Sequence, residues 1–149
     1  MMEHGAGGRR ILAVDDELQI LRALKLVLRA AGYEVVSADW DPILQHGLAH
    51  LGARHFVVDA RHLPFPDESF DAIATEPPYH QEATDIVAEA LQELHRVLKS
   101  GRRLAMLCAA SQADALRQQA ASLRLQVVLD VVIDRKGLDV VVLVWLKSK

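Results

Sequence analysis

The residues best placed for chemistry lie in the stretch 57–79, where two apolar runs each end in polar side chains. The first run ends at Asp59-Ala60, and the second ends at Thr75-Glu76 and is followed by Pro77-Pro78-Tyr79. Short apolar runs of this kind predict buried strands of an open α/β sheet. Ligands of such sheets bind outside the carboxyl ends of the strands. Both polar groups are therefore candidates for a binding site.

Acidic residues form a second group of candidates. Asp15-Asp16-Glu17 directly follows the apolar run 11–14, and Asp39 follows a second run at 34–38. Asp16 is also suited to cap the helix expected near Glu17, because a short carboxylate accepts hydrogen bonds from the free N–H groups of a helix start. Capping and ligand binding both stay open for this residue.

Alternating strands and helices must position these residues. Gly32 is expected to end the first helix in a left-handed conformation, and Asp41-Pro42 to start the second. Gly101 is expected to end the third helix, and Ser111 to cap the fourth. The predicted strands are 11–14, 34–38, 55–58, 71–74, 104–107, 125–133 and 138–146, and the predicted helices are 17–32, 41–52, 82–99 and 111–123.

This pattern predicts a doubly wound, three-layer, Rossmann-like α/β sheet of about seven strands in a single domain, residues 1–149. The last two strands are joined by the short turn 134–137, which predicts an antiparallel hairpin. The final strand is apolar without interruption over 140–145, whereas its partner carries Asp130 and Asp134. The final strand is therefore expected inside the sheet and its partner at the edge.

Composition limits the partners. The 149 residues are 51% hydrophobic and 25% charged with a formal net charge of −3, so no global basic field attracts nucleic acid or an anionic membrane. The single Cys108 excludes an internal disulfide. Residues 1–10 lack the apolar core of a signal peptide, and charges interrupt the run 11–33. We expect a soluble, cytoplasmic protein without a membrane partner, and the oligomeric state stays open.

From residue 39 to 149 the sequence resembles class I S-adenosylmethionine-dependent methyltransferases. The similar stretches are LPFPDESFDAI at 63–73 and HRVLKSGRRLAML at 95–107, together with the closing hairpin. The resemblance implies the strand order 3-2-1-4-5-7-6 and S-adenosylmethionine as cofactor. It places Asp39 where the family binds the ribose hydroxyls, and Asp59 with Ala60 where the family contacts the adenine amino group.

The segment Glu76-Pro77-Pro78-Tyr79 resembles the (Asp/Asn/Ser)-Pro-Pro-Tyr motif of methyltransferases that act on exocyclic amino groups of bases. The resemblance implies that Glu76 and the carbonyl of Pro77 accept hydrogen bonds from the target amine. It also implies that the ring of Tyr79 stacks on the base. Glu76 departs from the motif because its side chain is longer by one methylene. The implied substrate is a nucleic-acid base or a small molecule with a similar amine.

Residues 10–38 resemble instead the opening βαβ unit of response-regulator receiver domains. In that family an acidic pair after the first strand helps to hold Mg²⁺ beside a phosphorylated aspartate. Asp15 and Asp16 match the pair. The whole chain is then interpreted as a chimera, natural or engineered, of a receiver-like segment (10–38) and a methyltransferase-like segment (39–149).

The two resemblances lead to different functions. Methyltransferases have a glycine-rich turn after the first strand, but no glycine lies between Arg10 and Gly32, so three carboxylates would face the carboxylate of the cofactor. One such contact at ~4 Å costs up to about 4 kcal/mol, which weakens binding roughly a thousandfold. The leading hypothesis is an N-methyltransferase with weak or absent activity. The alternatives are a receiver-like phosphoacceptor, a metal-binding module using Asp15, Asp16 and Glu76, or a ligand-free protein that keeps only the fold.

Overall fold

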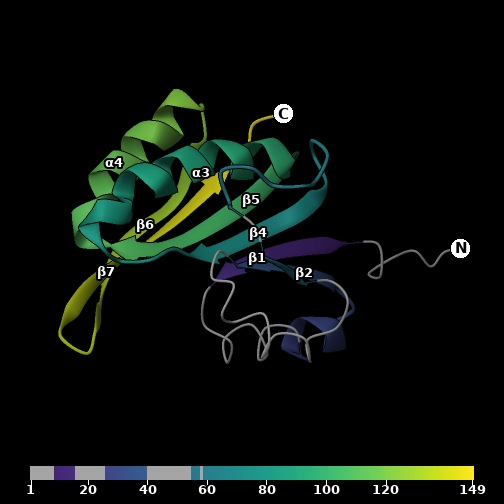
Figure 1. Ribbon diagram of the computed structural model, residues 1–149, viewed down its shortest axis with the longest axis horizontal. Helices are drawn as coiled ribbons and strands as arrows, with labels where there is room; N and C mark the ends of the chain where they lie inside the picture. The colour runs from purple at the N-terminus through teal and green to yellow at the C-terminus, as the bar shows by residue number, and fades with distance from the viewer. Residues whose placement is uncertain (1–8, 16–25, 40–54, 58) are drawn as a thin grey trace, which may run out of the picture.

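Seven strands of the described residues form one mixed sheet, in the order β3-β2-β1-β4-β5-β7-β6 (Figure 1). The computed structural model describes residues 9–15, 26–39, 55–57 and 59–149, and residues 26–30 are helical. The elements are β1 (Arg10–Asp15), β2 (Glu34–Asp39), β3 (His55–Val57), β4 (Phe70–Glu76), the 3₁₀ turn η4 (Gln81–Ala83), α3 (Thr84–Val97), β5 (Leu98–Ala109), α4 (Ala110–Ser122), β6 (Gln126–Arg135) and β7 (Leu138–Leu146).

The strand order confirms the order expected from the sequence. Strands β1 to β5 pair in parallel, and β7 is antiparallel to both β5 and β6. Strand β7 lies inside the sheet and β6 at its edge, as the apolar pattern predicts. The hairpin turn places Lys136 and Gly137 at φ values of 55° and 85°. Positive φ at both central residues is the backbone of a type I′ turn, which fits the twist of two antiparallel strands.

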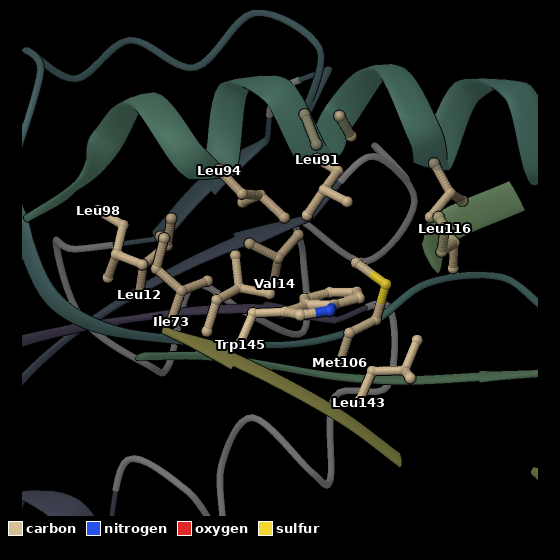
Figure 2. Close-up of a cluster of buried hydrophobic side chains, with 14 of the residues drawn as sticks. Leu12, Val14, Ile73, Leu91, Leu94, Leu98, Met106, Leu116, Leu143 and Trp145 are labelled. Atoms are coloured by element: carbon tan, nitrogen blue, oxygen red, sulfur yellow. The ribbon is translucent and has the colours of Figure 1, made fainter. Parts of the chain in front are cut away.

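Helices α3 and α4 cover one face of the sheet (Figure 1). Helix α3 buries Val87, Leu91 and Leu94, which recur every three or four residues and so lie on one side of the helix. They pack in one cluster with alternate residues of the strands, among them Ile73 and Trp145 (Figure 2). Because successive strand residues point to opposite faces, the residues between these buried ones lie on the face away from α3 and α4.

Helix α3 ends earlier than predicted. We expected Gly101 to end the helix, but α3 ends at Val97 and Leu98 is already extended. The ammonium of Lys147 donates hydrogen bonds to the carbonyls of His95 and Leu98, both at 2.7 Å. This contact comes from the far end of the chain and satisfies carbonyls that a helix end leaves free, which local sequence does not reveal. Gly101 instead takes φ +80° inside β5, where the pairing with β4 shifts its register.

The start of α4 also differs from the prediction. We expected Ser111 to cap the helix, but Ala109 is the N-cap residue. The side-chain oxygen of Gln112 accepts a hydrogen bond from the N–H of Ala109 at 3.1 Å. The side chain that completes the cap thus lies one residue further along the chain than expected.

The first helix ends as predicted. Gly32, two positions after the helical residues 26–30, has φ +93°, which confirms the left-handed conformation. The predicted helix 41–52 and the earlier part of the first helix lie outside the described residues. In the part of the chain that the structure describes, no helix is long and apolar enough to cross a membrane.

Candidate active site

The carboxyl ends of β1, β4 and β5 meet at one edge of the sheet, toward the turn of the β6–β7 hairpin (Figure 1). The register pairs Asp15 with Glu76 across β1 and β4, and Thr75 with Met106 across β4 and β5. The predicted catalytic residues therefore begin at the end of a strand in the middle of the sheet. Parallel sheets bind their ligands at this edge.

Glu76 stands at the centre of a hydrogen-bonded cluster. Its Oε2 atom accepts a hydrogen bond from the Tyr79 hydroxyl and one from Nη1 of Arg135, the latter at 2.5 Å. The same Arg135 nitrogen also donates to the Tyr79 hydroxyl oxygen at 3.2 Å. We call these three residues the Glu76–Tyr79–Arg135 cluster. The Glu76 side chain is 14% exposed, so its charge is largely removed from water and is offset by the guanidinium.

The cluster fixes the protonation of Tyr79. Burial of the phenol, and then its hydrogen bond to Glu76, raise the pKa of Tyr79 to about 12, although Arg135 acts in the opposite direction. The hydrogen bond to Glu76 also raises the pKa of Arg135. Near neutral pH Tyr79 is therefore a neutral hydrogen-bond donor and is not a base.

Thr75 has a structural contact. Its buried hydroxyl donates a hydrogen bond to the carbonyl of Val14 at 2.9 Å, which joins β4 to β1 one residue before their carboxyl ends. The hydroxyl proton is therefore directed at the protein backbone. This contact fixes the position from which Glu76 projects.

Gln112 holds the segment that follows Glu76. Its fully buried side-chain amide donates to the carbonyls of Pro78 and His80, at 2.8 and 3.1 Å, which flank Tyr79. Its oxygen accepts from Ala109, so one side chain ties the Pro-Pro-Tyr segment to the start of α4. A buried amide with all of these partners satisfied is a rigid anchor.

Arg135 and Gln112 were not predicted from the sequence. Arg135 directly precedes the Lys136-Gly137 turn, so a hairpin folded beside β5 brings it to the carboxyl edge. Gln112 follows the N-cap residue by three positions, the spacing at which glutamine bonds back to the start of a helix. The turn beside Arg135 and the spacing of Gln112 from the N-cap can be read from the sequence. The contacts of these residues with Glu76 and Pro78 cannot, because the fold sets them.

Asp59 and Ala60, the predicted adenine contacts, follow β3. The carboxylate of Asp59 accepts hydrogen bonds from the backbone N–H, Nε and Nη2 of Arg61, at 2.7 to 3.1 Å. These contacts lower the pKa of Asp59 to about 2. Ala60 is buried and packs in the core cluster. An adenine amino group would have to share the Asp59 carboxylate with Arg61.

The remaining predicted ligands lie at the edge of what the structure describes. Asp39 is the last residue of β2, and Asp15 is the last residue of β1. Their backbones are at the carboxyl ends of neighbouring strands, while their side chains, and all of Asp16, lie outside the described residues. Among the side chains that are described, no group of three histidine, cysteine, aspartate or glutamate residues comes together as metal ligands.

A cavity of about 520 Å³ adjoins the cluster. Its size lies within the range of small-molecule sites, roughly 300 to 1,000 Å³. Most of its described lining is aliphatic, and its charged members are Glu76 and Arg135. The described lining residues are Ala13, Ala74, Thr75, Glu76, Ala105, Met106, Leu107, Ile133, Arg135 and Val142.

The strand order, the closing hairpin and the polar carboxyl edge define the sheet of class I methyltransferases, and solved structures agree. The chain is similar to TrmN from Thermus thermophilus, with a TM-score of 0.73 and 23% identity over 94% of this chain and 44% of that chain. It is also similar to the PH0226 protein from Pyrococcus horikoshii OT3, with a TM-score of 0.72 and 13% identity over 93% and 82%. At these identities the likeness concerns the fold.

The family follows from the sequence comparison. The methyltransferase domain family matches residues 19–106, more than half of the chain, and the chain belongs to this family. Over 91 residues the chain is 40% identical to demethylmenaquinone methyltransferase from Thermus thermophilus. That match covers 57% of this chain but only 40% of the relative, so the chain spans well under two thirds of the relative's length.

The family match begins after Asp15-Asp16-Glu17. It starts at residue 19, so Asp15-Asp16-Glu17 lies outside it, and it includes 19–38. The similarity to methyltransferases thus extends into the segment that resembles a receiver domain. Residues 1–18, which include the acidic segment, and residues 107–149 lie outside the matched range.

Proposed function

We propose that the chain is an S-adenosylmethionine-dependent methyltransferase domain that acts on an exocyclic amine of a base or a similar ring, with low affinity for the cofactor. The observation that carries the proposal is the Glu76–Tyr79–Arg135 cluster at the carboxyl end of β4, in a chain of the methyltransferase domain family. When bound, the cofactor would supply the methyl group from its sulfonium.

Each residue of the motif has a positioning role in this proposal. Oε2 of Glu76 is engaged by Tyr79 and Arg135, so the amine would bind to Oε1, with the carbonyl of Pro77 as the second acceptor. Arg135 holds the carboxylate in place and offsets its charge. The bonded hydroxyl of Tyr79 keeps the ring in one orientation for stacking on the substrate. Holding an amine in line for attack is the contribution expected of side chains in a transfer between two bound molecules.

The residues present fit only one half of the cofactor. Asp39 ends β2 and Asp59 follows β3, which suits the ribose and the adenine. At the methionine end Asp15 is paired in register with Glu76, and Asp16-Glu17 follow where the family has glycine. Acidic residues repel the carboxylate of the cofactor, which supports low affinity. We attribute the poor fit at the methionine end of the cofactor to the receiver-like segment.

Methyl transfer tests the proposal. Radiolabelled S-adenosylmethionine at millimolar concentration is incubated with the chain and with oligonucleotides, free adenine or free cytosine. We expect slow labelling, and we expect Glu76→Ala to reduce it roughly 10- to 150-fold, because a hydrogen bond to a charged group contributes about 1.5 to 3 kcal/mol. Arg117→Gln is the control, because Arg117 pairs with Asp130 outside the described lining of the cavity. Equal labelling by the wild type and Glu76→Ala contradicts the assigned role.

The receiver-like alternative is not favoured by the strand order. Phosphotransfer requires the acceptor aspartate beside β1, but Asp59 follows β3, which lies two strands away, about 10 Å at ~4.8 Å per strand. Binding of Mg²⁺ by Asp15 and Asp16 stays a prediction, which a Mg²⁺-dependent rise in Tm would support. A protein that keeps only the fold would show neither methyl transfer nor a response to Mg²⁺.

A further inference from the structure

The cavity beside the cluster lies on the face of the sheet away from α3 and α4. Ala74 and Ala105 line it, and each lies between two residues that are buried on the helix side, such as Ile73 and Thr75 for Ala74. Strand side chains alternate between faces, so the alanines point away from the helices. The alanines therefore face away from the hydrophobic core shown in Figure 2, and Met106 belongs both to that core and to the cavity lining.

The floor of the cavity is formed by small side chains. The register pairs Ala13 with Ala74, and Ala74 with Ala105, so three methyl groups lie side by side on neighbouring strands. With strands ~4.8 Å apart, this floor is about 10 Å across, the width of a fused or extended ring system. Leu107 and Val142, which are paired across β5 and β7, continue the apolar surface at one side.

At the polar end of the cavity, the charges of the described lining residues balance. Glu76 and Arg135 carry opposite charges and are bonded to each other at 2.5 Å. The proton of the Thr75 hydroxyl is directed at the carbonyl of Val14. Within the described lining, a charged ligand would have to break the ion pair to find a partner, whereas a neutral ligand with one hydrogen-bonding group can bind beside the intact pair.

We infer that this cavity binds an uncharged, planar, largely apolar ring whose hydrogen-bonding substituent points to Glu76. Taken with the proposed function, this ring is the class of methyl acceptor. Binding of such a ring does not require the cofactor, so the inference can fail while methyl transfer is observed, and it can stand while methyl transfer is not.

Two fluorescent probes with the same ring system test it. N-phenylnaphthylamine is neutral and anilinonaphthalene sulfonate is anionic. Titrated into the full chain without cofactor, the neutral probe is expected to bind roughly tenfold more tightly than the anionic one, the difference that one unfavourable polar contact makes. Equal or stronger binding of the anionic probe overturns the inference.

Filling the floor should remove the site. Ala74→Leu adds three carbon atoms at the centre of the alanine floor, and we expect it to weaken the neutral probe roughly tenfold or more. Val132→Ser is the matched control, because Val132 is the neighbour of the lining residue Ile133 but lies on the opposite face of β6. If Val132→Ser weakens binding of the neutral probe and Ala74→Leu does not, the probe binds on the exposed strand β6 and the inference is wrong.

A charge variant tests the same site without changing its volume, in case Ala74→Leu does not fold. Glu76→Gln removes the negative partner of Arg135 and leaves the guanidinium available to the sulfonate. We expect the preference for the neutral probe to fall roughly fivefold or more, through a gain by the anionic probe. An unchanged preference in Glu76→Gln shows that the probes bind elsewhere and overturns the inference.

Discussion

At the scale of single residues, the site depends on a contact that joins distant parts of the chain. Arg135 reaches Glu76 across 59 positions of sequence and offsets a carboxylate that is otherwise poorly solvated. Glu76 is one methylene longer than the aspartate of the motif it resembles, and the guanidinium and the Tyr79 hydroxyl both bind the same oxygen of the extended side chain.

The first prediction concerns the titration of Tyr79. Its pKa of about 12 is above the ordinary value near 10, so the folded state retains the proton longer than the unfolded state does. The stability that comes from this shift is complete below about pH 10 and is lost as the pH rises from about 10 to about 12. In a pH titration followed by phenolate absorbance, one tyrosine should ionise above the ordinary pKa, and Tyr79→Phe should remove this step.

Glu76→Gln is the control for that titration. It removes the hydrogen bond to an ionised partner but keeps the burial, so the pKa of Tyr79 should move down toward its ordinary value without reaching it. A late step that is unchanged in Glu76→Gln would contradict the assignment of Glu76 as a cause of the shift.

The second prediction concerns Asp59 and Arg61. The guanidinium of Arg61 lowers the pKa of Asp59 to about 2, so the pair stabilises the folded state above about pH 4 and the contribution is lost as the pH falls from about 4 to 2. Arg61→Gln should lower stability slightly at neutral pH, and its difference from the wild type should vanish in that acidic window. Urea unfolding at several pH values measures it. A difference that grows in acid would contradict the pairing.

At the scale of elements, Gln112 connects the motif to α4. The third prediction is that Gln112→Ala lowers the free energy of unfolding by about 1 to 3 kcal/mol, because it leaves the partly buried carbonyls of Pro78 and His80 without this donor. Gln112→Glu is the comparison variant, because a carboxylate can accept a hydrogen bond from the N–H of Ala109 but cannot donate one to either carbonyl. We expect it to destabilise at least as much. Urea unfolding compares the variants, and full stability in Gln112→Glu would contradict the role of the amide protons.

The sequence predicted elements where local pattern alone determines them. The hairpin and its edge strand followed from the uninterrupted apolar run of β7 and the polar residues of β6, whereas the order of strands was implied by the resemblance to class I methyltransferases. The end of α3 at Val97 could not be predicted, because Lys147 supplies its capping contacts from the far end of the chain. Arg135 and Gln112 were missed for the same reason, since their partners are set by the fold.

At the scale of the whole molecule, the sheet ends in an exposed apolar edge. Strand β6 is last in the strand order and pairs only with β7 among the described strands. Its apolar side chains are widely exposed, with Val132 at 60%. Two of its three charged residues, Asp130 and Arg135, are engaged by Arg117 and Glu76 of the same chain. Edges of this kind pair with other chains.

The fourth prediction follows from that edge. Val132→Lys should reduce concentration-dependent association, because a lysine on an edge strand disfavours pairing with another chain. The free energy of unfolding should change by less than about 0.5 kcal/mol, as for other exposed positions. Light scattering over a concentration series measures association. Leu138→Lys is the control and should have little effect, because Leu138 is exposed but belongs to β7, which is paired on both sides. Equal effects of both lysines would contradict the role of the β6 edge.

The central claim for the whole molecule is that a methyltransferase domain binds its cofactor weakly because acids follow β1. Calorimetric titration with S-adenosylmethionine tests this most directly, comparing the wild type with the double variant Asp15→Gly, Asp16→Gly. We predict weak, millimolar binding by the wild type and at least about tenfold tighter binding by the variant, because like charges are removed and the backbone can approach the ligand. Micromolar binding by the wild type, unchanged in the variant, would contradict the account.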